Sequence, residues 1–125
     1  MPIAFDRLDH IALTVRDVDR SIAWYAEVLG FERRHAGEWG DVPAMLFAGD
    51  DSIALFPAED DDPVLDSPTV VDHVALRLGA DAFARAPAEL DRLGVAFERA
   101  DHVIALSLYI RDPDGHRIEL TTYER

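Results

Sequence analysis

Two histidines and one glutamate have the residue types and the placement that metal chemistry needs. His10 stands in the segment Leu-Asp-His-Ile-Ala-Leu, and His73 stands in the similar segment Val-Asp-His-Val-Ala-Leu, about half the chain further on. Glu119 lies near the end of the chain. Two neutral imidazoles and one carboxylate form a ligand set that holds a divalent metal and leaves positions open for water or substrate.

Each of these residues also has a plainer explanation when it is taken alone. A histidine in a strand is more often hydrogen-bonded or exposed than a metal ligand, and a glutamate in a strand is usually solvated. The repetition of the two histidine segments argues against the plainer explanation. His10 and His73 would occupy equivalent places in two copies of one unit.

The repetition extends well beyond the two histidines. Each histidine segment is followed by a helical pattern that ends in Leu-Gly and an apolar residue, which is Phe31 in the first copy and Val95 in the second. The Asp-His and Leu-Gly pairs shared by both halves predict an α+β fold built from two βαβββ modules, with a cupped mixed sheet and helices on its outer face. We expect one domain over residues 1–125, with module one at 1–57, an acidic linker at 58–69 and module two at 70–125.

Hydrophobic alternation and capping residues predict the elements of each module. In module one we expect a strand at 8–16, a helix that Asp17 or Asp19 caps and Gly30 ends, and strands at 31–36, 43–48 and 52–57. In module two we expect a strand at 71–78, a helix within 81–93 that restarts at Pro87, and strands at 95–99, 104–111 and 116–122. The segment at 112–115, Asp-Pro-Asp-Gly, predicts a tight turn between the last two strands.

Strand parity places the candidate chemistry on one face of the sheet. Successive strand residues point to opposite sides, so the apolar residues of each strand face the helix and the others face away. The side away from the helix then carries His10, His73, Tyr109, Glu119, Arg77, Arg111 and Arg117. By the same parity Asp9 and Asp72 point the other way and serve local structure, and parity assigns no role to His35, His102 or His116. A concave polar face of this kind suits a small ligand.

Composition excludes several classes of partner and site. The chain has no cysteine, which rules out disulfides, thiolate metal sites and cysteine nucleophiles. Its net charge of −13 makes nucleic acid and anionic membranes poor partners. We find no signal peptide and no apolar run that could span a membrane, so a cytoplasmic protein is expected. Open sheet edges predict a homodimer, in which a second chain covers them.

The sequence as a whole resembles the vicinal oxygen chelate superfamily of glyoxalases, bleomycin resistance proteins and extradiol dioxygenases. The resemblance is carried by residues 8–32, by Val-Asp-His-Val-Ala-Leu at 71–76 and by Tyr-Ile-Arg-Asp-Pro-Asp-Gly-His-Arg-Ile-Glu-Leu at 109–120. It implies paired βαβββ modules, usually a homodimer, and one divalent metal, Fe(II), Mn(II), Zn(II) or Ni(II). His10, His73 and Glu119 match the superfamily's metal ligands.

The resemblance leaves several activities open. Glyoxalase I and the epimerases usually add a Glu or Gln ligand from the fourth strand, and that strand here has none. Tyr109 precedes Glu119 at the spacing of an active-site Tyr in the thiol transferases and dioxygenases, but Ala12 replaces the Thr expected for transfer to fosfomycin. For extradiol cleavage the resemblance implies a further acid–base histidine, and His102 is the candidate. We expect a metal-dependent lyase, thiol transferase or dioxygenase acting on a small substrate with adjacent oxygens. Arg77, Arg111 or Arg117 would hold a substrate anion, and the alternative is that these arginines only balance charge on an acidic chain. The alternative is a non-catalytic, drug-binding protein of the bleomycin-resistance type.

Overall fold

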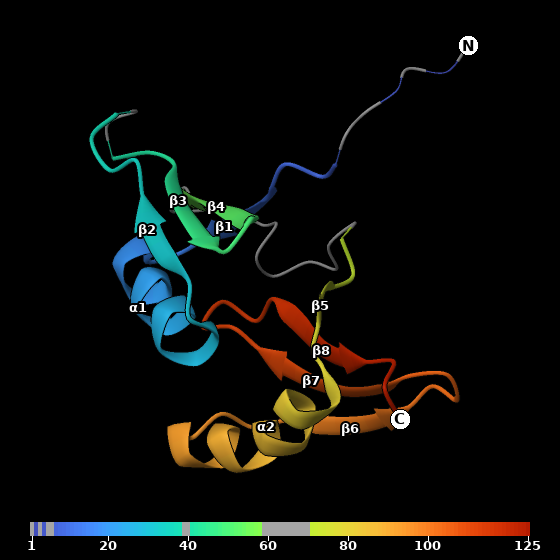
Figure 1. Cartoon of the computed structure of the whole chain (residues 1–125). Coiled ribbons are helices and arrows are strands. Elements are labelled where there is room, and N and C mark those ends of the chain that lie inside the picture. Colours follow the sequence, from blue (N-terminus) through green and yellow to red (C-terminus); the bar gives the residue numbers. More distant parts are fainter. Residues whose placement is uncertain (1, 3, 5–6, 39–40, 59–70) are drawn as a thin grey trace. The chain divides into compact units, whose positions relative to one another are not determined.

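The computed structural model describes residues 2, 4, 7–38, 41–58 and 71–125 of the chain (Figure 1). The chain divides into two compact units, Met1–Asp60 and Asp61–Arg125, each of which is described here by itself. Apart from Ala58, the acidic linker predicted at 58–69 lies outside the described residues. Because each unit has its own sheet and helix, each candidate residue is positioned by the elements of its own unit.

The first unit has one helix and four strands. They are β1 (Ile11–Val15), α1 (Val18–Leu29), β2 (Glu32–Arg34), β3 (Ala44–Ala48) and β4 (Asp51–Pro57). The strand order in the sheet is β1-β4-β3-β2, with β1 parallel to β4 and the other neighbours antiparallel. The connection from β1 through α1 therefore brings the chain back onto the same sheet.

The second unit repeats this arrangement element by element. It contains β5 (Val74–Arg77), α2 (Ala80–Leu93), β6 (Glu98–Asp101), β7 (Leu106–Arg111) and β8 (Arg117–Thr122). The order β5-β8-β7-β6, with β5 parallel to β8, is the order of the first sheet. The predicted α+β fold of two βαβββ units is confirmed, although most of the strands are shorter than the sequence pattern suggested.

Local chemistry sets both ends of α1 as the sequence predicts. The Asp17 carboxylate accepts a hydrogen bond from the backbone N–H of Arg20 at 3.0 Å, which satisfies one of the free donors of the first turn. Gly30 ends the helix in the left-handed conformation, at φ 72°, a position that glycine adopts without steric cost. The helix length is therefore encoded locally, before any packing against the sheet.

The predicted restart of the second helix at Pro87 is wrong, because α2 runs unbroken from Ala80 to Leu93 with Pro87 inside it. An interior proline typically costs about 3 kcal/mol, since it removes one hydrogen bond and crowds the preceding turn. Pro87 lies on the same helix side as Phe83, which is half-buried, and Leu90, which is 4% exposed. Packing of this stripe on the sheet keeps the two halves of the helix in line.

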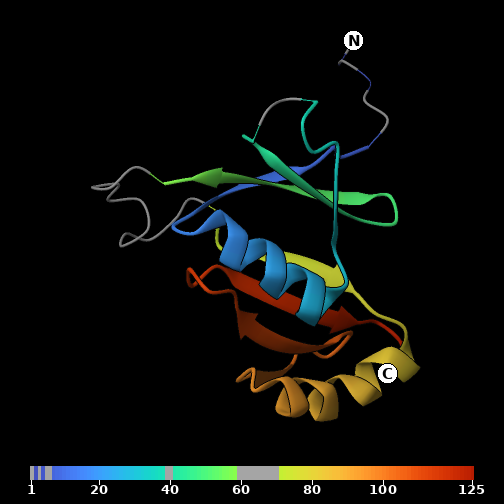
Figure 2. The same cartoon turned by 90° about the vertical axis from the view of Figure 1, so that its left-hand side faces the viewer.

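Each helix lies along one face of its own sheet, as Figure 2 shows. The residues between α1 and its sheet form a cluster of buried side chains: Leu13, Val15, Tyr25, Phe31, Ala44, Leu46, Ile53 and Leu55. In the second unit Leu108, Ile110, Ile118 and Leu120 have the same parity and are also buried. We call the opposite side of each sheet its helix-free face, and polar residues can gather there.

The turn between β7 and β8 is built as the sequence predicts. The backbone N–H of Gly115 donates to the carbonyl of Asp112, and the Asp112 carboxylate accepts from the N–H groups of Asp114 and His116, at 2.9 and 2.8 Å. Gly115 has φ 86°. The turn therefore holds Arg111 opposite Arg117 and sets the register of the whole hairpin.

None of the helices in the described part of the chain is long and apolar enough to cross a membrane.

Candidate functional site

The helix-free face of the second sheet carries an ordered set of side chains. Glu119 at the centre of β8 is paired with Ala75 on β5 and with Tyr109 on β7. One step along, Thr121 is paired with Ser107. Paired residues of neighbouring strands point to the same side, so the parity predicted from the sequence places these residues together. The small side chains around Glu119 leave its carboxylate room to interact.

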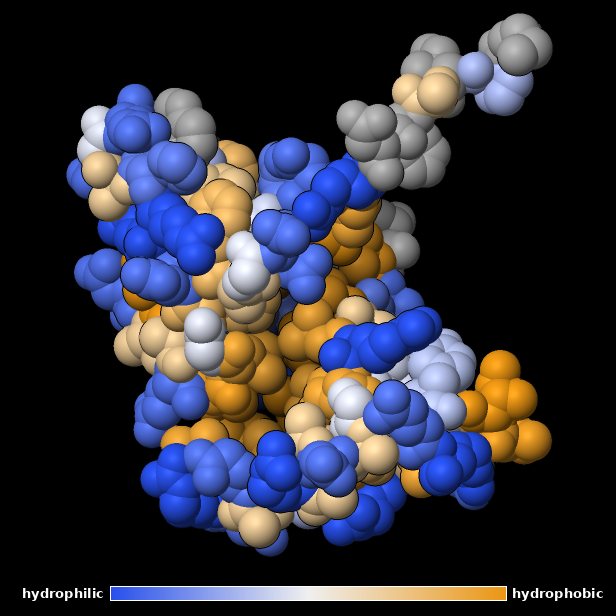
Figure 3. Space-filling view, viewed as in Figure 1, coloured by the Kyte–Doolittle hydropathy of each residue, from blue (hydrophilic) through white to orange (hydrophobic). Residues whose placement is uncertain are grey.

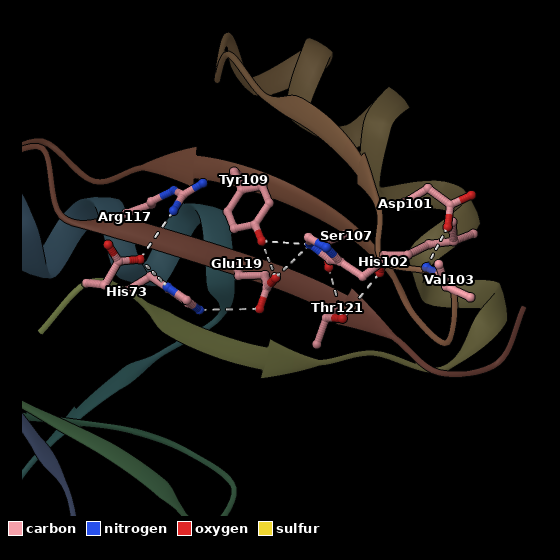
Figure 4. Close-up of polar contacts among 11 residues, drawn as sticks. His73, Asp101, His102, Val103, Ser107, Tyr109, Arg117, Glu119 and Thr121 are labelled. Atoms are coloured by element: carbon pink, nitrogen blue, oxygen red, sulfur yellow. Dashed lines mark hydrogen bonds and ion pairs between the residues drawn. The ribbon is translucent and has the colours of Figure 1, made fainter.

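Glu119 is the centre of a polar cluster in this unit (Figure 4). The Tyr109 hydroxyl donates a hydrogen bond to Oε1 of Glu119 at 2.5 Å. The other oxygen, Oε2, lies 3.6 Å from Nε2 of His73. The Glu119 side chain is only 12% exposed, whereas the His73 side chain is 33% exposed. The glutamate is thus recessed in the face, and one of its two oxygens is directed toward the histidine.

The surroundings of Glu119 favour its charged form. Burial raises the pKa of this carboxyl, but the hydrogen bond from Tyr109, the nearby Ser107 hydroxyl and the positive charge available to His73 and His102 outweigh burial, so the pKa lies below its usual value. The same hydrogen bond to Glu119, together with burial, raises the pKa of Tyr109 above its usual value. At neutral pH the pair is therefore a carboxylate and a protonated phenol.

Two buried hydroxyl groups support the carboxylate from the next row of the sheet. The Ser107 hydroxyl, 1% exposed, donates to Thr121 Oγ1 at 3.0 Å, and Thr121 is 8% exposed. The Thr121 hydroxyl in turn donates to the Leu106 carbonyl at 3.3 Å. Hydrogen bonds therefore satisfy both of these buried polar groups.

Asp72 holds His73 in a defined orientation. The Asp72 Oδ2 atom lies 2.6 Å from His73 Nδ1 and 3.3 Å from a guanidinium nitrogen of Arg117. The expectation that Asp72 points away from the candidate site is wrong, because Asp72 precedes the first residue of β5 and strand alternation does not govern it there. With the proton on Nδ1 facing this carboxylate, Nε2 of His73 presents its lone pair toward Glu119.

His10 carries the same arrangement in the first unit. The Asp9 Oδ2 atom lies 2.7 Å from His10 Nδ1, and both residues precede β1, which begins at Ile11. The expectation that Asp9 points away is wrong for the same reason as for Asp72. The structure therefore shows one aspartate–histidine pair at the start of the first strand of each unit, with Nε2 left to act as a ligand in both.

His102 belongs to the polar cluster, although the sequence alone offered it only as a candidate acid–base histidine for extradiol cleavage. Its Nε2 atom lies 2.9 Å from the Tyr109 hydroxyl and 3.6 Å from Glu119 Oε1. His102 stands in the connection between β6 and β7, where no strand periodicity predicts the direction of a side chain. His102 and Tyr109 are seven positions apart in the sequence, a spacing that lets two residues meet across a short hairpin. This spacing was the signal available in the sequence.

The three arginines proposed to bind a substrate anion have different contacts. The guanidinium of Arg117 lies 4.0 Å from the centre of the Tyr109 ring, a cation–π contact, and also reaches Asp72. The guanidinium of Arg77 lies 4.6 Å from the centre of the Tyr123 ring. Arg111 donates to the Gly115 carbonyl across the hairpin turn. Arg117 is thus the arginine that contacts the polar cluster directly.

The donor set fits a divalent metal. His73 Nε2 and Glu119 Oε2 each bring a lone pair to the same space, and a cation or proton between them removes the repulsion. Two ligand atoms, each about 2.1 Å from one ion, are about 3.4 Å apart at the tetrahedral angle, close to the separation here. Among the described residues no group of three or more His, Asp or Glu side chains is arranged to hold an ion, and His10 lies in the other unit.

Comparison with known proteins places this chain in one family. Residues 7–120 match the model of the Glyoxalase/Bleomycin resistance protein/Dioxygenase superfamily. The chain is 30% identical to the glutathione transferase FosA of Serratia marcescens over 113 residues, which cover 90% of this chain and 78% of that protein. The chain therefore belongs to the Glyoxalase/Bleomycin resistance protein/Dioxygenase superfamily.

Two further similarities extend the comparison. The chain is 31% identical to a catechol-2,3-dioxygenase of Bacillus subtilis over 117 residues, which cover 90% of this chain and 40% of that protein. Among solved structures, a glyoxylase/bleomycin resistance protein/dioxygenase domain from Frankia sp. EAN1pec is 25% identical, with a TM-score of 0.76. The alignment covers 95% of this chain and 93% of that domain, so the similarity includes both βαβββ units.

Proposed function

We propose that this protein is a metal-dependent enzyme of the cytoplasm that acts on a small substrate through two adjacent oxygen atoms. The observation that carries the proposal is the convergence of His73 Nε2 and Glu119 Oε2 at 3.6 Å, with His73 oriented by Asp72. His10 is the proposed third ligand, because its Asp9 partner leaves the same ring nitrogen free. A divalent ion held in this way supplies Lewis-acid chemistry to bound oxygens and leaves positions open for them.

The residues of the second unit then have separate tasks. Asp72 keeps the proton of His73 on Nδ1, so that Nε2 acts as a ligand. Tyr109 occupies Oε1 of Glu119 and leaves Oε2 on the side of His73. Since its pKa is raised, Tyr109 keeps its proton at neutral pH, and it could transfer its single hydrogen bond from Glu119 to a substrate oxygen bound beside it. The charge that develops on that oxygen would be stabilised by this donor.

The similar proteins reduce the set of candidate reactions but leave more than one. One similar protein is a glutathione transferase and another is a catechol dioxygenase, so thiol transfer and oxidative cleavage are the leading reactions, ahead of a glyoxalase-like lyase. β4 runs Asp-Ser-Ile-Ala-Leu-Phe-Pro, with Ala54 at its centre and neither Glu nor Gln, which favours a three-ligand site. Fe(II), Mn(II), Zn(II) and Ni(II) remain the candidate ions.

Metal binding by ligand variants tests the proposal. We expect the chelator-treated protein to bind one divalent ion per chain in a calorimetric titration. Single His10→Ala, His73→Ala and Glu119→Gln variants should each lose more than about 100-fold in affinity, above the range typical for loss of an outer partner of a ligand. Because the ligand histidines must be neutral, affinity should also fall as the pH drops through about 6.

A matched control separates ligand loss from general damage. His35→Asn removes a histidine of the first unit that contacts Glu38, and asparagine tolerates the positive φ of 62° found there. This variant should bind metal like the parent protein, and all four variants should keep the parent circular dichroism. Full metal occupancy in the three ligand variants would show that other residues hold the ion, and a parent protein that binds none of the four ions would refute the proposal.

We also propose that the working form is a homodimer. In the described part of the chain the first sheet ends at β1 and β2, and the second ends at β5 and β6. Sheet edges are places where a second chain can pair or pack. Light scattering at micromolar concentration should give twice the chain mass of 13.9 kDa, and a mass near that of one chain would contradict the homodimer.

A further inference from the structure

His102 is the member of the polar cluster for which the proposed chemistry has no task. It is held at the tip of the β6–β7 hairpin, and Figure 4 shows its ring reaching back from that tip to Tyr109 and Glu119. Its side chain is 48% exposed, so apolar burial does not explain this position. The hydrogen bond to Tyr109 at 2.9 Å is the contact that needs an explanation.

The direction of this hydrogen bond follows from counting protons. The Tyr109 hydroxyl has one proton, and at neutral pH the Glu119 carboxylate can only accept, so the tyrosine proton points to Glu119. The tyrosine oxygen must then accept the hydrogen bond that joins it to His102 Nε2. His102 consequently carries a proton on Nε2. This is the opposite tautomer to that of His73, whose proton lies on Nδ1 beside Asp72.

The tip that carries His102 has an uncommon backbone. The N–H of Ile104 donates to the carbonyl of His102 at 2.8 Å, which closes a three-residue γ-turn around Val103 at φ 72°. A β-branched residue at positive φ is a genuine outlier, and such a conformation costs on the order of 1–3 kcal/mol. Val103 and Ile104 are 80% and 72% exposed, so their burial does not offset this cost.

The hydrophobic protrusion at the right-hand margin of Figure 3 lies where this hairpin ends in Figure 1. Polar contacts beneath it hold the turn. The Asp101 carboxylate accepts from the backbone N–H of Val103 at 2.9 Å, and it also accepts from two guanidinium nitrogens of Arg125, at 2.5 and 3.1 Å. The N–H of His102 closes the hairpin on the Ala105 carbonyl at 2.8 Å. Both neighbours of His102 along the chain are therefore fixed.

We propose that His102 is a positioning residue: it donates from Nε2 to the Tyr109 oxygen and so directs the tyrosine proton to Glu119, and the Asp101–Arg125 pair and the γ-turn at Val103 hold it there. This inference rests on the proposed function, in which Tyr109 and Glu119 act on a bound oxygen. A phenol that accepts one hydrogen bond becomes a stronger donor of another. His102 thus prepares Tyr109 to donate, while the site keeps one geometry.

Nuclear magnetic resonance of the metal-free protein tests the proposal without any activity. At pH 8, where an ordinary histidine is neutral, ¹⁵N-labelled protein should show His102 with its proton on Nε2 and His73 with its proton on Nδ1. The ¹³Cζ resonance of Tyr109, identified among the three tyrosines by its loss in Tyr109→Phe, reports hydrogen bonding at the phenol oxygen. It should move in His102→Leu, which removes the donor. His102→Gln, whose amide can donate from a similar reach, should restore most of the shift.

Two more variants test the hairpin tip. Val103→Gly permits positive φ without strain but frees the turn, and Arg125→Ala removes the partner of Asp101. Both should keep the circular dichroism and broaden the His102 signals, and both should move Tyr109 in the direction seen for His102→Leu. An unchanged Tyr109 resonance in His102→Leu, or a His102 proton mainly on Nδ1, would overturn the proposal.

Metal titration of the same variants separates this inference from the proposed function. Since His102 is not a proposed ligand, His102→Leu should bind the ion within about threefold of the parent, far less than the loss expected for an outer partner of a ligand. A parent protein that binds no ion would refute the proposed function and leave the tautomer and Tyr109 results as they are. A loss of affinity in His102→Leu as large as that in His73→Ala would refute the positioning role.

Discussion

The two units of the chain have the same strand order and differ at the centre of the helix-free face. The equivalent rows are Ala12, Ala54 and Met45 in the first sheet, and Ala75, Glu119 and Tyr109 in the second. The first unit therefore has an apolar pair where the second has a carboxylate and a phenol.

The features present in both units identify what the duplicated scaffold requires. Both helices end at a left-handed glycine, Gly30 or Gly94, and both first strands follow an aspartate–histidine pair. The carboxylate–phenol pair, present in the second unit alone among these equivalent rows, is not needed to form a βαβββ unit. This difference supports the proposed chemical roles of Glu119 and Tyr109, and the aspartate–histidine pairs are proposed to perform one task in both units.

The largest expected effect tests whether the two scaffolds are equivalent. Leu55 in β4 and Leu120 in β8 occupy matching core positions and are 0% and 4% exposed. Leu55→Ala and Leu120→Ala should each lower the free energy of unfolding by about 2–5 kcal/mol, through lost burial and the cavity left behind. Urea unfolding measures this loss. If one variant loses less than about 1 kcal/mol, the two cores do not support their sheets in the same way.

A smaller effect tests whether the aspartate–histidine pairs share a task. Asp9→Asn and Asp72→Asn keep the side-chain shape but remove the charge that holds the Nδ1 proton. Each should weaken metal binding by about 10–100-fold, the usual cost of losing an outer partner of a ligand. Asp72→Asn should have the greater effect because it also releases Arg117. Calorimetric titration measures both, and an unchanged affinity in Asp9→Asn would restrict this task to the second unit.

The smallest effect concerns the proton of Tyr109. The hydrogen bond to Glu119, with burial and the nearby carboxylate charge, raises the pKa of Tyr109 in the folded protein. The resulting stabilisation is fully present below the unfolded pKa of about 10 and is lost as the pH rises through the folded value. Ultraviolet absorbance of the metal-free protein should show one tyrosine ionising late, and Glu119→Gln should lower its pKa. No change in Glu119→Gln would mean that the hydrogen bond does not govern this proton.

The sequence predicts the scaffold well because its signals are local. Alternation of apolar residues determines which side of a strand faces the helix, and Asp17 and Gly30 mark the two ends of α1. The repeat then predicts that the second half follows the same plan. Parity alone placed Glu119 and Tyr109 on one face, and the register confirms that they are directly paired.

What the sequence does not predict lies outside regular elements or depends on packing. Asp9 and Asp72 precede their strands, so alternation gave them the wrong direction. His102 lies in a turn whose conformation depends on Asp101 and on the distant Arg125. Pro87 is tolerated inside α2 because the side of the helix that carries Leu90 packs against the sheet, an effect that intrinsic propensity does not contain.

The five-residue connection from Asp112 to His116 determines which sequence changes this site can tolerate during evolution. It holds Arg111 opposite Arg117 and, two residues further along each strand, Tyr109 opposite Glu119. Since side chains alternate, a slip of β8 by one residue would turn Glu119 toward the helix and bring Ile118 or Leu120 to face Tyr109. Substitutions in the turn are tolerated as long as its hydrogen bonds form, but an inserted or deleted residue that shifts the register of β8 would remove the pairing of Tyr109 with Glu119. The length of this connection, more than its composition, should therefore be under the stricter selection.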